Sequence, residues 1–208
     1  MGDQSRTGDH HPARIPVLVR PMRAEEVDAA LDAHATVAAE GRWLGTEAGF
    51  DRAARRAQWL ASLEDVAGRT LVVVDAGTGR LLGHGRVQGA RYGVADLGMS
   101  VVADARGRGV GGALLDALLE VARDLGAHKA ALQVWPHNER AIRLYLSRGF
   151  VVEGRIRRHY RRSSGQRWDA ILMGLSLDPE GDAPGPALPD GTALPDAACL
   201  PAELRIRD

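Results

Sequence analysis

Four glycines crowd one short stretch of the chain, and this stretch has the composition of a phosphate-binding loop. They are Gly107, Gly109, Gly111 and Gly112, with Arg106 and Arg108 among them. An apolar run at 97–102 precedes them, and residues 113–125 repeat leucine and alanine at helical spacing, so the order is strand, loop, helix. A helix begins with unpaired N–H groups and partial positive charge, and glycine lets an anion approach them closely. The stretch therefore predicts a phosphate site.

The residues after the last glycine narrow the kind of phosphate ligand. A Walker A loop requires Lys and Ser or Thr there, whereas this chain has Ala113-Leu114, so a nucleoside triphosphate site is excluded. The spacing also satisfies G-x-G-x-x-G, but the next apolar run, 129–135, carries no acidic residue for a dinucleotide ribose. A dinucleotide enzyme and a purely structural turn stay open as alternatives.

Two blocks together resemble one family, the GCN5-related N-acetyltransferases (GNAT). Arg106-x-x-Gly109-x-Gly111 is similar to the acetyl-CoA pyrophosphate signature of that family, and residues 138–150 resemble its second motif. The resemblance is strong over residues 95–175, weaker back to residue 15, and absent at both ends. It implies an α/β fold with a mixed, mostly antiparallel central sheet of six or seven strands, a splayed central pair and flanking helices.

The resemblance also implies an activity. We expect an N-acetyltransferase that moves the acetyl group of acetyl-CoA to a primary amine by direct attack in a ternary complex. The acceptor would be a small molecule such as an amino acid or an antibiotic, or a protein amine. The alternative is a non-catalytic acyl-CoA-binding or regulatory domain, which the absence of an obvious base mildly favours. The single cysteine, Cys199, lies in the expected tail and gives little support for an acyl-cysteine step.

Transferred residue by residue, the resemblance gives a donor site. Backbone groups of the strand before the loop would hold the pantetheine arm, with an N–H near Val101 as oxyanion donor, and loop amides would hold the pyrophosphate. The expected cofactor-binding residues are Met99, Val101, Val102, Arg106, Gly107, Arg108, Gly109, Val110, Gly111, Gly112, Asn138 and Tyr145.

Tyr145 is the first candidate for catalysis. It shares a helical face with Asn138, and the resemblance implies that its hydroxyl donates a proton to the departing thiolate. A tyrosine packed in the core is the alternative. Asp96 is the first candidate for a base, with Glu47, His137 and His159 behind it; a water chain or a merely exposed aspartate are the other interpretations.

The acceptor is expected between the first two helices. By resemblance, the connection between these helices lines the acceptor pocket, which makes Trp43, Glu47 and Phe50 the candidate contacts. The two aromatic residues fit equally well as anchors of the loop on the core.

The pattern of apolar residues along the whole chain supplies the elements that must position such a site. Strands are predicted at 15–21, 70–75, 81–88, from 95, 129–135, 151–162 and 167–177, and helices at 24–40, 51–63, after Gly112 and at 138–149. The basic run 155–162 alternates along a strand, which favours a solvated edge over a nucleic-acid surface.

Composition sets the outer limits. The 208 residues suit one acetyltransferase domain at 15–177 between a polar tail at 1–14 and a Pro/Gly-rich tail at 178–208. A net charge of zero gives no reason to expect nucleic acid or membrane as partner, and no metal site is expected. One cysteine and no apolar leader predict a cytoplasmic protein, and a homodimer is left open.

Overall fold

The computed structural model describes residues 13–65 and 68–178. The predicted tails, with Cys199, lie outside these ranges except for Ala13, Arg14 and Asp178. The described strands are β1 Val17–Pro21, β2 Arg69–Asp75, β3 Leu81–Arg91, β4 Val94–Val101, β5 Lys129–Val134, β6 Val151–Arg161 and β7 Arg167–Ser176. The helices are α1 Val27–Ala39, α2 Arg52–Leu63, α3 Val110–Asp124 and α4 Glu139–Leu146, with short 3-10 turns η1 Ala24–Glu26 and η2 Ala103–Ala105.

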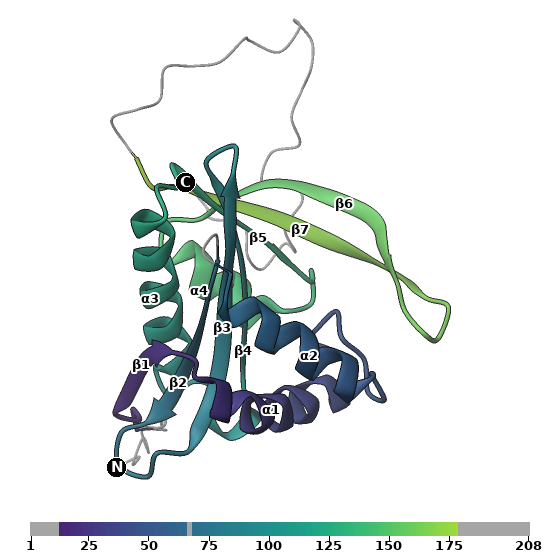
Figure 1. Ribbon diagram of the computed structural model, residues 1–208. Helices are drawn as coiled ribbons and strands as arrows, with labels where there is room; N and C mark the ends of the chain where they lie inside the picture. The colour runs from purple at the N-terminus through teal and green to yellow at the C-terminus, as the bar shows by residue number, and fades with distance from the viewer. Residues whose placement is uncertain (1–12, 66–67, 179–208) are drawn as a thin grey trace, which may run out of the picture.

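The strands form one sheet in the order β1-β2-β3-β4-β5-β7-β6 (Figure 1). Every neighbouring pair is antiparallel except β4 and β5. The predicted mixed, mostly antiparallel sheet is therefore confirmed. A dinucleotide-binding fold is built on a mostly parallel sheet, so this topology argues against that alternative.

The parallel pair separates soon after it forms. Its register runs from Val94 opposite Lys129 to Asp96 opposite Ala131 and goes no further. The N–H of Val102 donates to the carbonyl of Leu82 on β3. Because backbone groups alternate in direction along a strand, the N–H and C=O groups of the odd-numbered residues 97–101 face the gap toward β5. The predicted splayed pair is thus present, with backbone donors along one side.

Helices cover both faces of the sheet (Figure 1). β2 shows the cause, because Leu71 and Val73 pack into the core cluster under α3 and α4, while Val72 and Val74 pack under α1 and α2. A strand buried on both faces reads as a continuous apolar run, as residues 71–74 do. Within the described ranges, no helix has the length and apolar character needed to cross a membrane.

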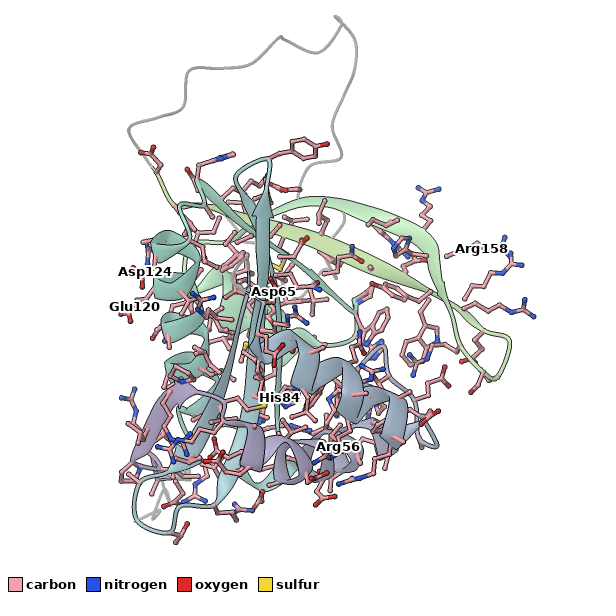
Figure 2. The ribbon with its side chains drawn as sticks, viewed as in Figure 1. Arg56, Asp65, His84, Glu120, Asp124 and Arg158 are labelled. Atoms are coloured by element: carbon pink, nitrogen blue, oxygen red, sulfur yellow. The ribbon has the colours of Figure 1, made fainter. Side chains whose placement is uncertain are left out.

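β6 is one of the two edge strands of the sheet, and with β7 it extends away from the rest of the sheet (Figure 1). The strand is irregular between Ile156 and Tyr160, where Arg158 adopts a positive φ of 53°. Arg158 points into solvent from this bend (Figure 2). The basic run on this strand is therefore largely a solvated edge, as its alternation predicts.

Candidate active site

A cavity of about 210 Å³ lies where β4 and β5 part. Three structural units meet there: the two splayed strands, the start and middle of α4, and the loop between α1 and α2. The residues around it are Trp43, Leu44, Gly45, Leu97, Gly98, Met99, Gln133, Val134, Trp135, Asn138, Tyr145, Tyr160 and Ala170. None of these side chains is charged, so a ligand here meets aromatic rings, amides and backbone groups.

Gly98 supplies the open floor of this cavity. A Cβ placed on it would have no heavy atom within 4 Å, outside its immediate chain neighbours. Because side chains alternate along a strand, Gly98 faces away from the neighbouring Leu97 and Met99, which join the core under α3. A ligand can therefore approach the β4 backbone closely at this point.

Tyr145 reaches the cavity from α4 with most of its ring buried. The side chain is 8% exposed, and its ring packs against Phe150 at a centroid distance of 5.7 Å. Among the described residues, none hydrogen-bonds its hydroxyl. Burial raises the pKa of Tyr145 to about 12, because the phenolate is poorly solvated there. The hydroxyl is protonated at neutral pH and available to a ligand.

Asn138 starts the helix that carries Tyr145. Its side-chain oxygen accepts a hydrogen bond from the N–H of Ala141 at 3.3 Å, as the predicted N-cap should, and the residue lines the cavity. The structure therefore brings together Asn138, Tyr145 and Met99, three of the predicted donor-site residues.

The glycine loop ends at the start of α3, in the order strand, loop and helix that the sequence predicts. Gly107 and Gly109 have φ values of 75° and 87°, a region that residues with a Cβ avoid, and Gly109 is the N-cap of α3. Glycine has no side chain with which to cap the first N–H groups of α3, from Val110 onward, and no side-chain cap bond is formed there. Arg108 anchors the loop, since its Nε donates to Ala13 O and its carbonyl accepts from Ile15 N.

The last two glycines of the loop lie inside α3 and serve packing. A Cβ on Gly112 would lie 2.7 Å from Nη2 of Arg148, and one on Gly111 would lie 3.4 Å from Leu144. Both contacts come from α4 and its C-terminal end, so small residues here let the two helices approach.

Two residues that are predicted to contact the cofactor form hydrogen bonds within the protein. Arg106 donates from Nε to the Val101 carbonyl at 2.9 Å and from its two other nitrogens to Glu40 at 2.7 and 2.5 Å. The backbone N–H of Val102 donates to the carbonyl of Leu82, so this N–H faces β3 and not the gap.

The three predicted acceptor residues go to three different places. Trp43 lines the cavity. Glu47 lies on a second hollow beyond the loop, where the N–H and hydroxyl of Ser163 hold its carboxylate and lower its pKa. Phe50 packs edge-on against His34 at 5.7 Å in the core under α1 and α2. For Phe50, the structure matches the anchoring interpretation.

Asp96 lies at the last paired position of the β4–β5 register, exposed to solvent. It is not among the residues that line the cavity. Its placement matches the interpretation of an exposed strand aspartate.

Sequence reasoning missed the far wall of the cavity. Tyr160 of β6 donates its hydroxyl to Oε1 of Gln133 at 2.9 Å, and Trp135 packs edge-on against Tyr160 at 4.7 Å. The positions of these aromatic residues near the ends of predicted strands could have pointed to a ligand site. That they line one cavity depends on how the sheet curves, which the sequence does not give.

Arg162 is the exception to the solvated basic run. Its side chain is only 5% exposed and stacks over Trp168 at 4.4 Å. Its Nη1 donates to the carbonyls of Leu44 and Gly45 at 3.0 and 3.2 Å. Alternation alone predicts a solvated arginine, and that prediction is wrong because the α1–α2 loop folds over this end of β6.

A pair of buried histidines lies on the α1 side of the sheet. The rings of His34 and His84 are 5.2 Å apart, and Nδ1 of His84 lies 3.3 Å from the Ser100 hydroxyl (Figure 2 marks His84). Burial lowers the pKa of His34 to about 4 and that of His84 to about 3, so both rings are neutral at pH 7.

The comparisons with known proteins agree with this geometry. Residues 35–150 match the family described as the acetyltransferase (GNAT) family. The chain is also 32% identical over 139 residues to an L-methionine sulfoximine/L-methionine sulfone acetyltransferase of Pseudomonas paraeruginosa, which covers 66% of this chain and 76% of that protein. The chain belongs to the GNAT acetyltransferase family. It is an acetyl-CoA-dependent N-acetyltransferase, as the two sequence blocks predict.

Solved GNAT structures share the fold. A GCN5-related N-acetyltransferase from Kribbella flavida superposes with a TM-score of 0.68 at 26% identity, covering 77% of this chain and 98% of that one. A phosphinothricin acetyltransferase from Sinorhizobium meliloti, solved with AcCoA, superposes with a TM-score of 0.70 at 20% identity, covering 82% and 93%. The second likeness shows the fold alone.

Proposed function

We propose that this GNAT enzyme acetylates the amine of a small amino-acid-like molecule in the cavity between β4 and β5. The observation that carries the proposal is the uncharged, aromatic lining of a cavity of about 210 Å³ that has Tyr145 in its wall. A protonated amine is poorly solvated in such surroundings, which favours the neutral form that can attack a thioester. The relative that acts on methionine sulfoximine or sulfone supports an acceptor of this size.

The donor would lie along the gap. In this arrangement the first amides of α3, after Gly109, hold the pyrophosphate, and the pantetheine arm runs past the gap-facing groups of Met99 and Val101. Asn138 lies beside this path. The N–H of Val101 faces the gap and would stabilise the oxyanion that forms when the amine attacks the thioester carbonyl.

Tyr145 would stabilise the leaving thiolate chiefly by a hydrogen bond. A thiol has a pKa of about 8.5, well below the value of about 12 for Tyr145, so complete proton transfer from the phenol is unfavourable. In this mechanism the amine nitrogen bonds to the carbonyl carbon and the C–S bond breaks. The proton lost by the amine passes through water to the thiolate, and Asp96 is at most an outer part of that path.

A coupled assay tests the acceptor class. Release of free coenzyme A is followed with a thiol reagent against L-methionine sulfone, L-methionine sulfoximine, phosphinothricin, spermidine and a peptide with a free N-terminus. We expect the highest kcat/KM among the first three. A clear preference for spermidine or the peptide would contradict the proposal.

A cytoplasmic location and a homodimer stay predictions of the sequence.

A further inference from the structure

Glu40 and Arg106 form an ion pair that joins the two halves of the cleft. Glu40 is the C-cap of α1, where the acceptor loop begins, and Arg106 opens the glycine loop. The guanidinium contacts both carboxylate oxygens, at 2.5 and 2.7 Å, and the side chains of Arg106 and Glu40 are only 21% and 30% exposed, respectively. A two-pronged contact of this kind fixes orientation as well as distance.

Each partner of this pair also hydrogen-bonds a residue beside the cleft. Oε2 of Glu40 accepts the indole N–H of Trp43 at 2.5 Å, and the Arg106 guanidinium lies 5.8 Å from the Trp43 ring centroid. Nε of Arg106 holds the carbonyl of Val101, whose backbone faces the gap. One guanidinium is thus connected to the acceptor wall and to the end of the donor strand.

An anion bound at the glycine loop would compete with Glu40 for this arginine. Arg106 begins the turn 106–109 that leads directly to the first amides of α3, so a pyrophosphate placed at those amides attracts the guanidinium that Glu40 now holds. Weakening the contact between Glu40 and Arg106 in turn changes the position of the Glu40 carboxylate, which accepts the hydrogen bond of the Trp43 indole N–H. We infer that Arg106 is a positioning residue through which coenzyme A bound at the glycine loop alters the setting of Trp43.

This inference rests on the proposed donor site, and its test needs no acceptor. Binding of coenzyme A is measured by calorimetry in the wild-type protein and in Glu40→Gln. Removing the competing charge leaves Arg106 to the pyrophosphate, so Glu40→Gln is expected to bind coenzyme A about fivefold more tightly, at the low end of usual coupling energies. Unchanged or weaker binding would overturn the inference.

Asp104→Asn is the matched control for charge alone. Asp104 lies in η2, next to the loop, but pairs with Arg80 at 2.7 Å instead of Arg106. We expect its affinity for coenzyme A to stay within about twofold of wild type, because the guanidinium competition is intact. An equal gain in both variants would reduce the effect to bulk charge and overturn the inference.

Trp43 provides an independent readout. Its emission is obtained as the difference between the wild type and Trp43→Phe, which keeps the other three tryptophans. Coenzyme A is expected to change this emission in the wild type and not in Glu40→Gln or Arg106→Lys, since lysine cannot hold Glu40 and the Val101 carbonyl together. Calorimetric heat in the wild type without a Trp43 signal sinks the inference alone, whereas absence of heat sinks the proposed donor site.

Discussion

Most of the proposed donor half of the cleft is assembled from neighbours in sequence, and much of the proposed acceptor half from residues about a hundred positions apart. β4, the glycine loop and the start of α3 follow one another within residues 94–112. By contrast, Arg162 holds the carbonyl of Leu44 across 118 positions, and His137 contacts the carbonyl of Arg42 across 95. The donor side depends on backbone geometry and glycine, whereas the acceptor side depends on long side chains that meet only after folding.

This difference predicts where each half fails. A backbone-built anion site is sensitive to φ angles, because these direct its amides. A wall fixed by side chains from distant elements is sensitive to the loss of one buried contact, because unpaired carbonyls are left behind. Single substitutions can therefore separate the two halves.

Arg162→Met should have the largest effect. The carbonyls of Leu44 and Gly45 lose their donor, and Trp168 loses its stacked cation. We expect a loss of about 2–4 kcal/mol in the free energy of unfolding, measured with urea. Arg161→Met, at the exposed neighbouring position, should change stability by less than about 0.5 kcal/mol. Similar losses in both would contradict the buried role of Arg162.

Tyr145→Phe tests the point where the two halves meet. The variant keeps the ring packed against Phe150 and loses the hydroxyl, so folding and coenzyme A affinity should be retained. We expect kcat to fall about a hundredfold, the lower range for a group that stabilises a leaving atom. Steady-state kinetics with the best amine of the panel measure this. An unchanged kcat would remove Tyr145 from the mechanism.

Gly109→Val tests the backbone nature of the donor side. At φ 87° a β-branched residue is strained, and the first amides of α3 should turn away from the anion. Affinity for coenzyme A should fall about tenfold, for a strain of roughly 1–2 kcal/mol. Gly165→Val carries the same strain at φ 83° in the β6–β7 turn and should leave this affinity unchanged. Equal losses in both variants would mean that the effect is global.

The buried histidine pair under α1 and α2 predicts that the free energy of unfolding depends on pH. The pKa of His34 is about 4 in the folded protein against 6.5 ordinarily, so between these pH values the unfolded chain binds a proton at this ring and the folded protein does not. The stability that the neutral, buried ring contributes is therefore complete above pH 6.5 and is lost as pH falls toward 4. His34→Leu should recover about 1–2 kcal/mol of the loss between pH 7.5 and pH 5.0 in urea titrations. His159→Leu, at an exposed site, is the control, and equal recovery in both variants would show that burial of His34 is irrelevant.

Asp96→Asn should have the smallest effect. Asp96 is exposed and outside the cavity lining, so its loss should change kcat by no more than about twofold at pH 7.5. A drop of tenfold or more, with a displaced acid limb in the pH profile, would make Asp96 the base.

Local patterns predicted most of the fold. The runs of β2 and β5 and the N-caps Asp51 and Asn138 appear where the sequence places them, because strand alternation and capping act over a few residues. Phe50 and Glu47 are harder, since a loop residue is directed by whatever it meets in space. Their separate destinations, the core and a second hollow, could not be read from spacing.

The order of residues along the chain by itself determined the strand, glycine loop and helix that form the donor side, because glycine φ angles and helix N–H groups are local properties. Only the tertiary structure decided which arginines are held by the protein itself. In the sequence Arg162 looks like any solvated arginine and Arg106 is predicted to contact the cofactor, yet each becomes a fixed contact because a distant segment supplies oxygen atoms to its guanidinium.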